Sequence, residues 1–211
     1  YYVSHFLRIS YGFIGEEMMK YIKIMMLLLF SSTIVANENN YVIDDSHFSI
    51  GFLVEHAGYA KTLGLFKQIE GKYTYDQSLN LVKDLVMTIN TDSVFTNHNK
   101  RDAHLRSPDF LDVEKFPTMT FMVDEYDLSK TPGKLKGKFT LLGVTKDVVL
   151  DFNINKVAEY PFRVGLSKPI VMGVSARASL NRSDYGMSYG VDKNLVGDEI
   201  ELIIEFEARQ Q

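Results

Sequence analysis

The sequence predicts an all-β protein in which about eight antiparallel strands close into a barrel, with a short helical insertion near residues 91–112. Three observations lead to this fold class. Most of the chain after residue 40 alternates between apolar and polar residues with period two. Turn-forming residues separate the alternating runs. Several runs reach about ten residues, a length that favours a curled barrel over a sandwich.

The clearest strand is the segment DEIELIIEFEAR near the end of the chain. Its glutamates fall on one face, and the opposite face carries Ile200, Leu202, Ile204 and Phe206. One charged and one apolar face are typical of antiparallel sheet with one side in water. Weaker alternation predicts further strands, and the full set lies near residues 41–45, 48–56, 63–75, 80–90, 118–127, 134–143, 146–156 and 197–208, with another within 162–180. The segment GVTKD, residues 143–147, is predicted to join two of them as a tight hairpin.

The N-terminal part reads as a targeting segment followed by one domain. Residues 1–17 precede the first methionine and are interpreted as a non-native upstream extension. Residues 18–36 place two lysines before a short apolar run and end in small residues, the order of a secretory signal peptide. A retained membrane anchor is the alternative, although the apolar run is shorter than the roughly 20 residues a spanning helix needs. We therefore expect a periplasmic or secreted single domain over residues 37–211.

Composition excludes several classes of function. The chain has no cysteine, which excludes disulfides, thiolate catalysis and cysteine-based metal sites. Its net charge is -4, without a basic block, so nucleic-acid binding is not expected.

The alternation stops in the segment NHNKRDAHLRSPDFLD, residues 97–112. Thr91 or Asp92 is predicted to cap a first helical turn, and Asn97 or Asn99 a second one that Pro108 ends. We expect this helix to plug one end of the barrel. The predicted plug residues are Arg101, Asp102, His104, Leu105 and Phe110, with Leu111 and Phe116 also facing inward. Arg101 and Asp102 would tie the plug to strand ends or to Asp109 and Asp112.

Two alternatives use the same residues for chemistry. A metal or hydrolytic site would employ His98, His104, Arg101 and Asp102, with Ser107 as a nucleophile. His98 and His104 are six positions apart, which puts them on different faces of a helix. His47 and His56 are nine apart and would point to opposite sides of a strand. No nucleophile-elbow motif accompanies Ser107. No metal site and no catalytic residue are therefore predicted.

Several segments together resemble one known family. RDAHLRSPDFLDVEKFPTMTF, at residues 101–121, closely resembles the signature region of the YceI-like family of secreted bacterial proteins. YVIDDSHFSIGFLVEHAG is similar to its opening strand pair, although Phe48 departs from the small polar residue usual there. GLFKQIEGKYTYD, GKLKGKFTLLGVTKDVVL and NRSDYGMS match further elements in the same order. The resemblance covers roughly residues 41–208.

This resemblance implies a lipocalin-like barrel that binds an isoprenoid chain, such as a polyprenyl lipid or an isoprenoid quinone, without enzymatic activity or a cofactor. The inward faces of the strands supply the candidate tunnel residues, namely Phe52, Val54, Leu65, Phe66, Met87, Ile89, Phe121, Val123, Phe139, Leu141, Phe152, Leu202, Ile204 and Phe206. His47, His56, Arg182 and Tyr185 are candidate contacts to a head group. Transient membrane contact for lipid exchange is expected, the oligomeric state stays open with a dimer among the options, and a ligand-free, stress-related interaction protein is the remaining alternative.

Overall fold

The computed structural model describes residues 38–211, and the predicted extension and signal peptide lie outside these described residues. Ten strands are present, β1 (Glu38–His56), β2 (Ala60–Phe66), β3 (Ile69–Asp76), β4 (Leu81–Asn90), β5 (Val94–Phe95), β6 (Thr118–Asp127), β7 (Gly133–Leu141), β8 (Val144–Glu159), β9 (Ile170–Asn181) and β10 (Val196–Gln210). The helical elements are η1 (Thr91–Ser93), α2 (Asn99–Arg106), η2 (Leu128–Lys130) and η3 (Arg182–Tyr185). None of the helices within residues 38–211 is long and apolar enough to cross a membrane.

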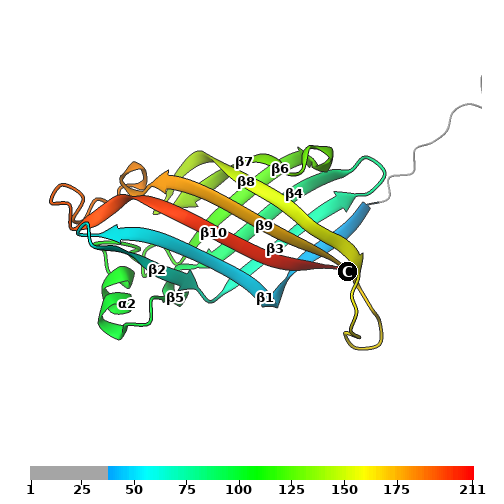
Figure 1. Ribbon diagram of the computed structural model, residues 1–211, viewed down its shortest axis with the longest axis horizontal. Coiled ribbons are helices and arrows are strands. Elements are labelled where there is room, and N and C mark those ends of the chain that lie inside the picture. The colour runs from blue at the N-terminus through cyan, green and yellow to red at the C-terminus, as the bar shows by residue number, and fades with distance from the viewer. Residues whose placement is uncertain (1–37) are drawn as a thin grey trace, which may run out of the picture. The chain divides into compact units, whose positions relative to one another are not determined.

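The strands form one antiparallel sheet that closes because β1 pairs with β10 (Figure 1). β2 and β3 pair with successive parts of β1, so they act as one interrupted strand. β5 continues the course of β4 beside β2. Counted in this way, the barrel has eight strands, which confirms the predicted fold class. The strand predicted over 63–75 is split at Lys67 and Gln68, and the two segments predicted at 41–45 and 48–56 form one strand.

The alternation of apolar and polar residues along each strand determines which side chains face the barrel interior. In β7, Leu135, Phe139 and Leu141 are buried, whereas the three lysines of the strand, which alternate with the inward-facing residues, are exposed. The hairpin to β8 is tighter than predicted, since Leu142 and Gly143 alone form the turn and both have positive φ. Residues 144–147, predicted as part of the turn, belong to β8.

The two ends of the barrel are built differently. At the first, called here the plug end, α2 contacts β5, and η3 contacts β9 and β10 (Figure 1). At the second, called the loop end, β10 ends and residues 160–169 connect β8 to β9. Tyr41 and Tyr73 stack near this end with ring centroids 5.2 Å apart, and the Tyr73 hydroxyl donates to the sulfur of Met172. These buried side chains pack the interior at the loop end.

Candidate functional site

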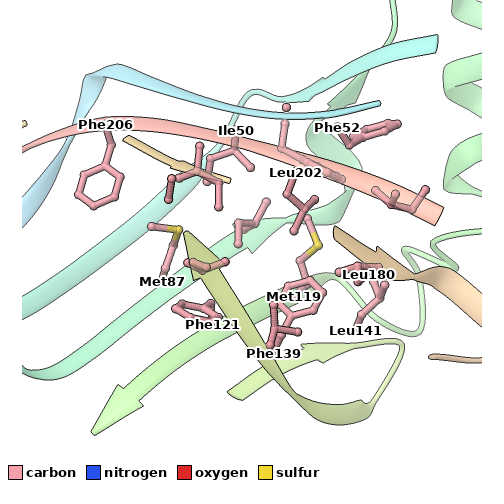
Figure 2. Close-up of a pocket in the computed structure, with 18 of the residues that line it drawn as sticks. Ile50, Phe52, Met87, Met119, Phe121, Phe139, Leu141, Leu180, Leu202 and Phe206 are labelled. Carbon is pink, nitrogen blue, oxygen red and sulfur yellow. The ribbon is translucent and has the colours of Figure 1, made fainter. Parts of the chain in front are cut away.

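The interior of the barrel contains an apolar cavity. Its volume is about 180 Å³, which is room for roughly a dozen water-sized spheres. Side chains from strands all around the barrel point into it, among them Ile50, Met87 and Phe121 (Figure 2). The lining runs from Leu128 of η2 to Leu105 of α2, and therefore extends along the barrel. Arg182 is the one charged residue in this lining.

Most of the predicted tunnel residues border this cavity. Twelve of the fourteen do so, namely Phe52, Val54, Phe66, Met87, Ile89, Phe121, Phe139, Leu141, Phe152, Leu202, Ile204 and Phe206. Leu65 was predicted wrongly, because it precedes the inward-facing Phe66 on the same strand and its side chain points out, with 36% of its surface exposed. Val123 is buried but does not border the cavity. Contact of these residues with a lipid stays a prediction.

Other lining residues were missed although a signal for them existed. Leu135, Val148 and Leu150 share their strand faces with predicted residues of β7 and β8. The same alternation could have identified them. Met187, in contrast, comes from the segment after η3, where no strand periodicity applies.

The helix α2 begins with an unexpected cap. The ring Nδ1 of His98 accepts from the backbone N–H of Arg101 at 3.2 Å and so caps the helix. Asn97 cannot serve because its φ of 59° lies in the left-handed region, and Asn99 is already the first helical residue. Likewise, η1 is capped by the side chain of Asn90, so Thr91 and Asp92 were wrongly predicted as caps. Ser107 ends α2 before Pro108, as predicted.

The plug is fixed through Thr96, which precedes α2. The carboxylate of the buried Asp102 accepts from the Thr96 backbone N–H at 2.8 Å and from its hydroxyl. The guanidinium of Arg101 donates to the hydroxyl and to the carbonyl oxygen of Thr96. These bonds close the turn in front of the helix. Because Thr96 directly follows β5, the two residues tie α2 to a strand end, which is one of the two predicted arrangements, and not to Asp109 or Asp112.

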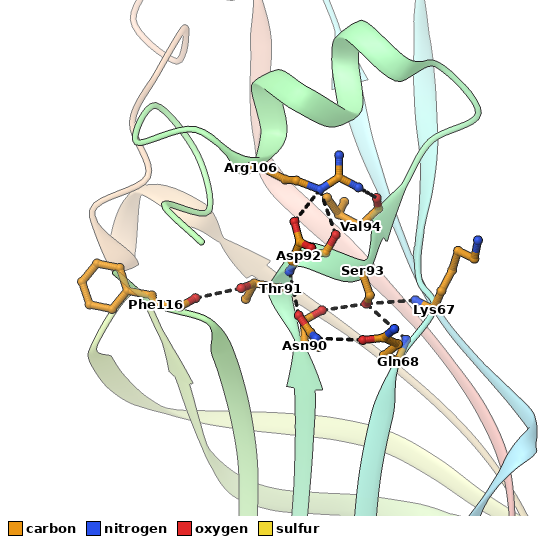
Figure 3. A network of polar contacts seen from close by, with 9 residues as sticks. All are labelled: Lys67, Gln68, Asn90, Thr91, Asp92, Ser93, Val94, Arg106 and Phe116. Atoms are coloured by element: carbon orange, nitrogen blue, oxygen red, sulfur yellow. Dashed lines mark hydrogen bonds and ion pairs between the residues drawn. The ribbon is translucent and has the colours of Figure 1, made fainter. Parts of the chain in front are cut away.

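A second set of bonds holds α2 to the strand ends (Figure 3). Arg106 donates to the carbonyl oxygens of Asp92 and Val94 and pairs with the Asp92 carboxylate at 2.9 Å. The Ser93 hydroxyl donates to the carbonyl of Asn90 and accepts from the backbone N–H groups of Lys67 and Gln68. These contacts join η1 to the point where β2 passes into β3.

The apolar underside of the plug faces the cavity as predicted for Leu105, Phe110 and Leu111. Phe116 does not, because its ring lies against the tight turn at Gly143. His104 packs edge-on against Phe110 and Tyr189, with ring centroids 5.0 Å from each. Its Nε2 lies 2.9 Å from the Asp109 carboxylate.

The side chains proposed for a catalytic or metal site are engaged separately. The Ser107 hydroxyl donates to the backbone carbonyl of His104 and not to its ring. Asp102 binds Thr96, and His98 caps the helix. Ser107, His104 and Asp102 therefore do not form a hydrogen-bonded relay of the kind a triad needs.

The four candidate head-group contacts are not brought together. Arg182 is 1% exposed, and its guanidinium donates to four backbone carbonyls, those of Met187, Tyr189, Val196 and Gly197. Burial lowers the pKa of Arg182. Tyr185 is buried against Phe139, and burial raises the pKa of its hydroxyl. His47 and His56 are exposed at different places along β1.

A charged cluster on the barrel wall was missed entirely. Between Ile43 and Phe48, β1 departs from its register with β10, and Glu207 alone faces the extra residues. Here Asp44 forms an ion pair with Arg209 and lies 2.7 Å from the Nδ1 of His47. Burial raises the pKa of the Asp44 carboxyl, but hydrogen bonds from Ser46 and His47 and the charge of Arg209 outweigh it and lower the pKa to about 2. Asp44, His47 and Glu207 have ligand atoms within 4.8 Å of one another, but Arg209 already balances the buried carboxylate.

Comparison with known proteins agrees with this architecture. The YceI-like domain matches residues 41–208. Protein YceI of Salmonella arizonae is 34% identical over 185 residues, which cover 88% of this chain and 93% of that protein. The solved structure of Campylobacter jejuni YceI is 32% identical, with a TM-score of 0.64 over 74% of this chain and 90% of that one.

Two more distant structures share the fold. BcnA of Burkholderia cenocepacia has a TM-score of 0.66 at 16% identity, over 78% of this chain and 98% of that one. A polyisoprenoid-binding domain from Saccharophagus degradans has a TM-score of 0.63 at 14% identity, over 81% of this chain and 98% of that one. Because the family domain spans almost the whole barrel and the Salmonella protein shares a third of its residues with it, this chain belongs to the YceI-like family.

Proposed function

We propose that the protein binds the chain of an isoprenoid lipid inside the barrel and carries or stores that lipid without transforming it. The observation that supports this most directly is the cavity, whose lining is almost entirely apolar and runs along the barrel. Each methylene that moves from water into such a space contributes about 0.8 kcal/mol. A long apolar chain can therefore be held without a strong polar anchor.

Three further points support the proposal. The one charged residue in the cavity lining is engaged within the protein, since Arg182 donates to backbone carbonyls. The Saccharophagus degradans neighbour, which has the same fold, is a polyisoprenoid-binding domain. The predicted signal peptide fits a periplasmic or secreted carrier that meets lipids outside the cytoplasm.

The direct test is to identify the ligand of protein purified from a cell that exports it. Organic extraction and native mass spectrometry should find a co-purifying prenyl chain. In a thermal-shift series, an isoprenoid quinone at about 100 times its Kd should stabilise the protein by about 2.7 kcal/mol, which is a rise in Tm of roughly 5–10 °C at this chain length. The same quinone head group without the prenyl chain is the matched control and should give no shift.

Ala176→Leu provides a control within the protein. Ala176 is 3% exposed and borders the cavity, so a larger side chain there would occupy the space of the ligand. The outward-facing Val149, which is 46% exposed, offers V149L as the matched variant. We expect A176L to lose most of the quinone-dependent shift and V149L to keep it. A wild-type protein that melts unchanged with every isoprenoid would instead favour the ligand-free interaction protein.

A further inference from the structure

The connection between β8 and β9 is a folded, projecting loop with apolar residues on its outside. Its base is closed by a hydrogen bond from the Tyr160 N–H to the Pro169 carbonyl at 2.8 Å. Near its tip, the Val164 N–H donates to the Ser167 carbonyl, and Gly165 with a φ of 63° allows the tight turn between them. The Arg163 guanidinium donates to the Leu166 carbonyl at 3.1 Å.

This turn presents two large apolar side chains to solvent. Leu166 is 95% exposed, the highest value for a large apolar residue in the described part of the chain, and Phe162 is 68% exposed. Val157, on the adjoining end of β8, is 44% exposed. Because the loop is held by its own hydrogen bonds, the exposure is a property of its folded form.

The charge of the same segment is opposite to that of the rest of the protein. Over residues 156–168 there are three basic residues, Lys156, Arg163 and Lys168, and one acidic residue, Glu159. All four side chains lie in exposed positions. The only ion pair that the structure gives among them joins Lys168 to Glu159 at 3.8 Å, a separation and exposure at which such pairs contribute little. The loop is thus a cationic segment with protruding apolar side chains on a protein whose net charge is negative.

We propose that the β8–β9 loop docks the protein on an anionic lipid bilayer, with Phe162 and Leu166 inserted among the lipids and Lys156, Arg163 and Lys168 against the head groups. Proteins that lie in the membrane interface combine apolar insertion with attraction of Lys and Arg to anionic lipids in this way. The proposal rests on the proposed function, because docking would bring the loop end of the barrel to the membrane from which an isoprenoid could be taken. Beyond the proposed function, the docking proposal specifies which surface contacts the membrane. It also specifies that this surface selects anionic lipids.

The plug end offers an internal comparison. Tyr59, in the turn between β1 and β2, is 91% exposed and thus as prominent as Leu166. Its surroundings are acidic, since Lys61 lies among Glu55, Glu199 and Glu201. An exposed aromatic residue in an acidic setting would be repelled by an anionic bilayer. We therefore expect the protein to dock through the loop end and not through the plug end.

The absence of tryptophan from the chain allows a clean test. In L166W the single tryptophan reports the loop alone, and in Y59W it reports the plug end. Vesicles of phosphatidylglycerol, or of phosphatidylcholine as the neutral control, are added to each variant. We expect a blue shift of L166W emission with phosphatidylglycerol only, together with quenching by brominated lipid, and no response of Y59W.

Titration of each variant with vesicles then measures how much the apolar and the basic side chains contribute to vesicle binding. F162S/L166S should bind phosphatidylglycerol vesicles at least tenfold more weakly than wild type. At low salt, K156Q/K168Q should bind phosphatidylglycerol vesicles about fivefold more weakly for each charge removed. Its affinity for neutral vesicles should equal that of wild type. No response of L166W, an equal response of Y59W, or equal responses on both lipids would overturn the proposal. The quinone thermal shift of L166W in detergent reports ligand binding independently, so failure of docking is distinguishable from failure of the proposed function.

Discussion

The ring of Phe52 lies directly over Gly64, its cross-strand partner on β2. A Cβ on Gly64 would come within 2.1 Å of the Phe52 ring. Phe121 lies over Gly137 in the same manner, since a Cβ on Gly137 would come within 2.3 Å of the Phe121 ring. Both rings border the cavity, so the two glycines fix how far the rings lean back toward the barrel wall. A side chain at either glycine would push its ring into the cavity.

We therefore predict that Gly64→Ala and Gly137→Ala each destabilise the barrel by about 1–3 kcal/mol through overpacking and weaken isoprenoid binding. Gly173→Ala is the matched control, since a Cβ there would meet only Asn155, at 3.9 Å. Urea unfolding with and without ligand measures both effects. Equal losses of stability in all three variants would mean that the cost comes from the glycine backbone and not from the rings.

Arg182 should be among the most sensitive positions of the plug end. Removing its guanidinium takes one donor from each of four backbone carbonyls, of which that of Met187 is bonded in a buried place and the other three in partly buried places. Each buried group left unpaired costs about 1–3 kcal/mol. We expect Arg182→Met to destabilise by at least about 3 kcal/mol in denaturant unfolding, and Arg182→Lys by less because an ammonium keeps some donors. Lys134→Met removes an exposed ion pair with Asp151 and should cost less than about 1 kcal/mol.

Acid should weaken the wall cluster at Asp44. Its pKa in the folded protein is about 2, below the ordinary 3.8. Since the folded pKa is lowered, the stabilisation is present above about pH 4 and is lost as the pH falls toward 2. The difference is on the order of 2 kcal/mol. We expect the free energy of unfolding to fall less steeply in Asp44→Asn than in wild type between pH 5 and 2, with Asp45→Asn as the control for net charge. Parallel curves for wild type and D44N would contradict this account.

The barrel was predictable from the sequence because strand alternation is a local signal that burial enforces. The lysines of β7 and the glutamates of β10 mark the outside so clearly that most cavity residues followed from counting by two. The same rule shows the error at Leu65, since neighbours on a strand cannot both face inward. The alternation gave a wrong inward-facing residue only where both faces of the strand segment carry apolar residues.

The wall cluster could not be predicted in this way. Asp44 meets Glu207 and Arg209 only because β1 departs from its register with β10, which no local pattern announces. The cap of α2 was missed for a different reason. Asn97 and Asn99 are the commoner capping residues, but the left-handed backbone at Asn97 moved the role to His98. Both features depend on the path of the backbone, and residue type alone does not determine that path.

The plug should depend on Asp102 for its attachment and not for chemistry. Its buried carboxylate accepts both donors of Thr96, whereas the Asp109 carboxylate is 52% exposed beside His104. Asp102→Ala leaves these donors unpaired, and we expect a loss of about 2–3 kcal/mol. Asp109→Asn should cost less than about 1 kcal/mol because its pair is exposed. Hydrogen exchange should show faster exchange in D102A over residues 96–106 than over β7, because the loss loosens α2 before it opens the barrel. Uniformly faster exchange throughout the barrel would mean that Asp102 supports the whole fold and not the plug.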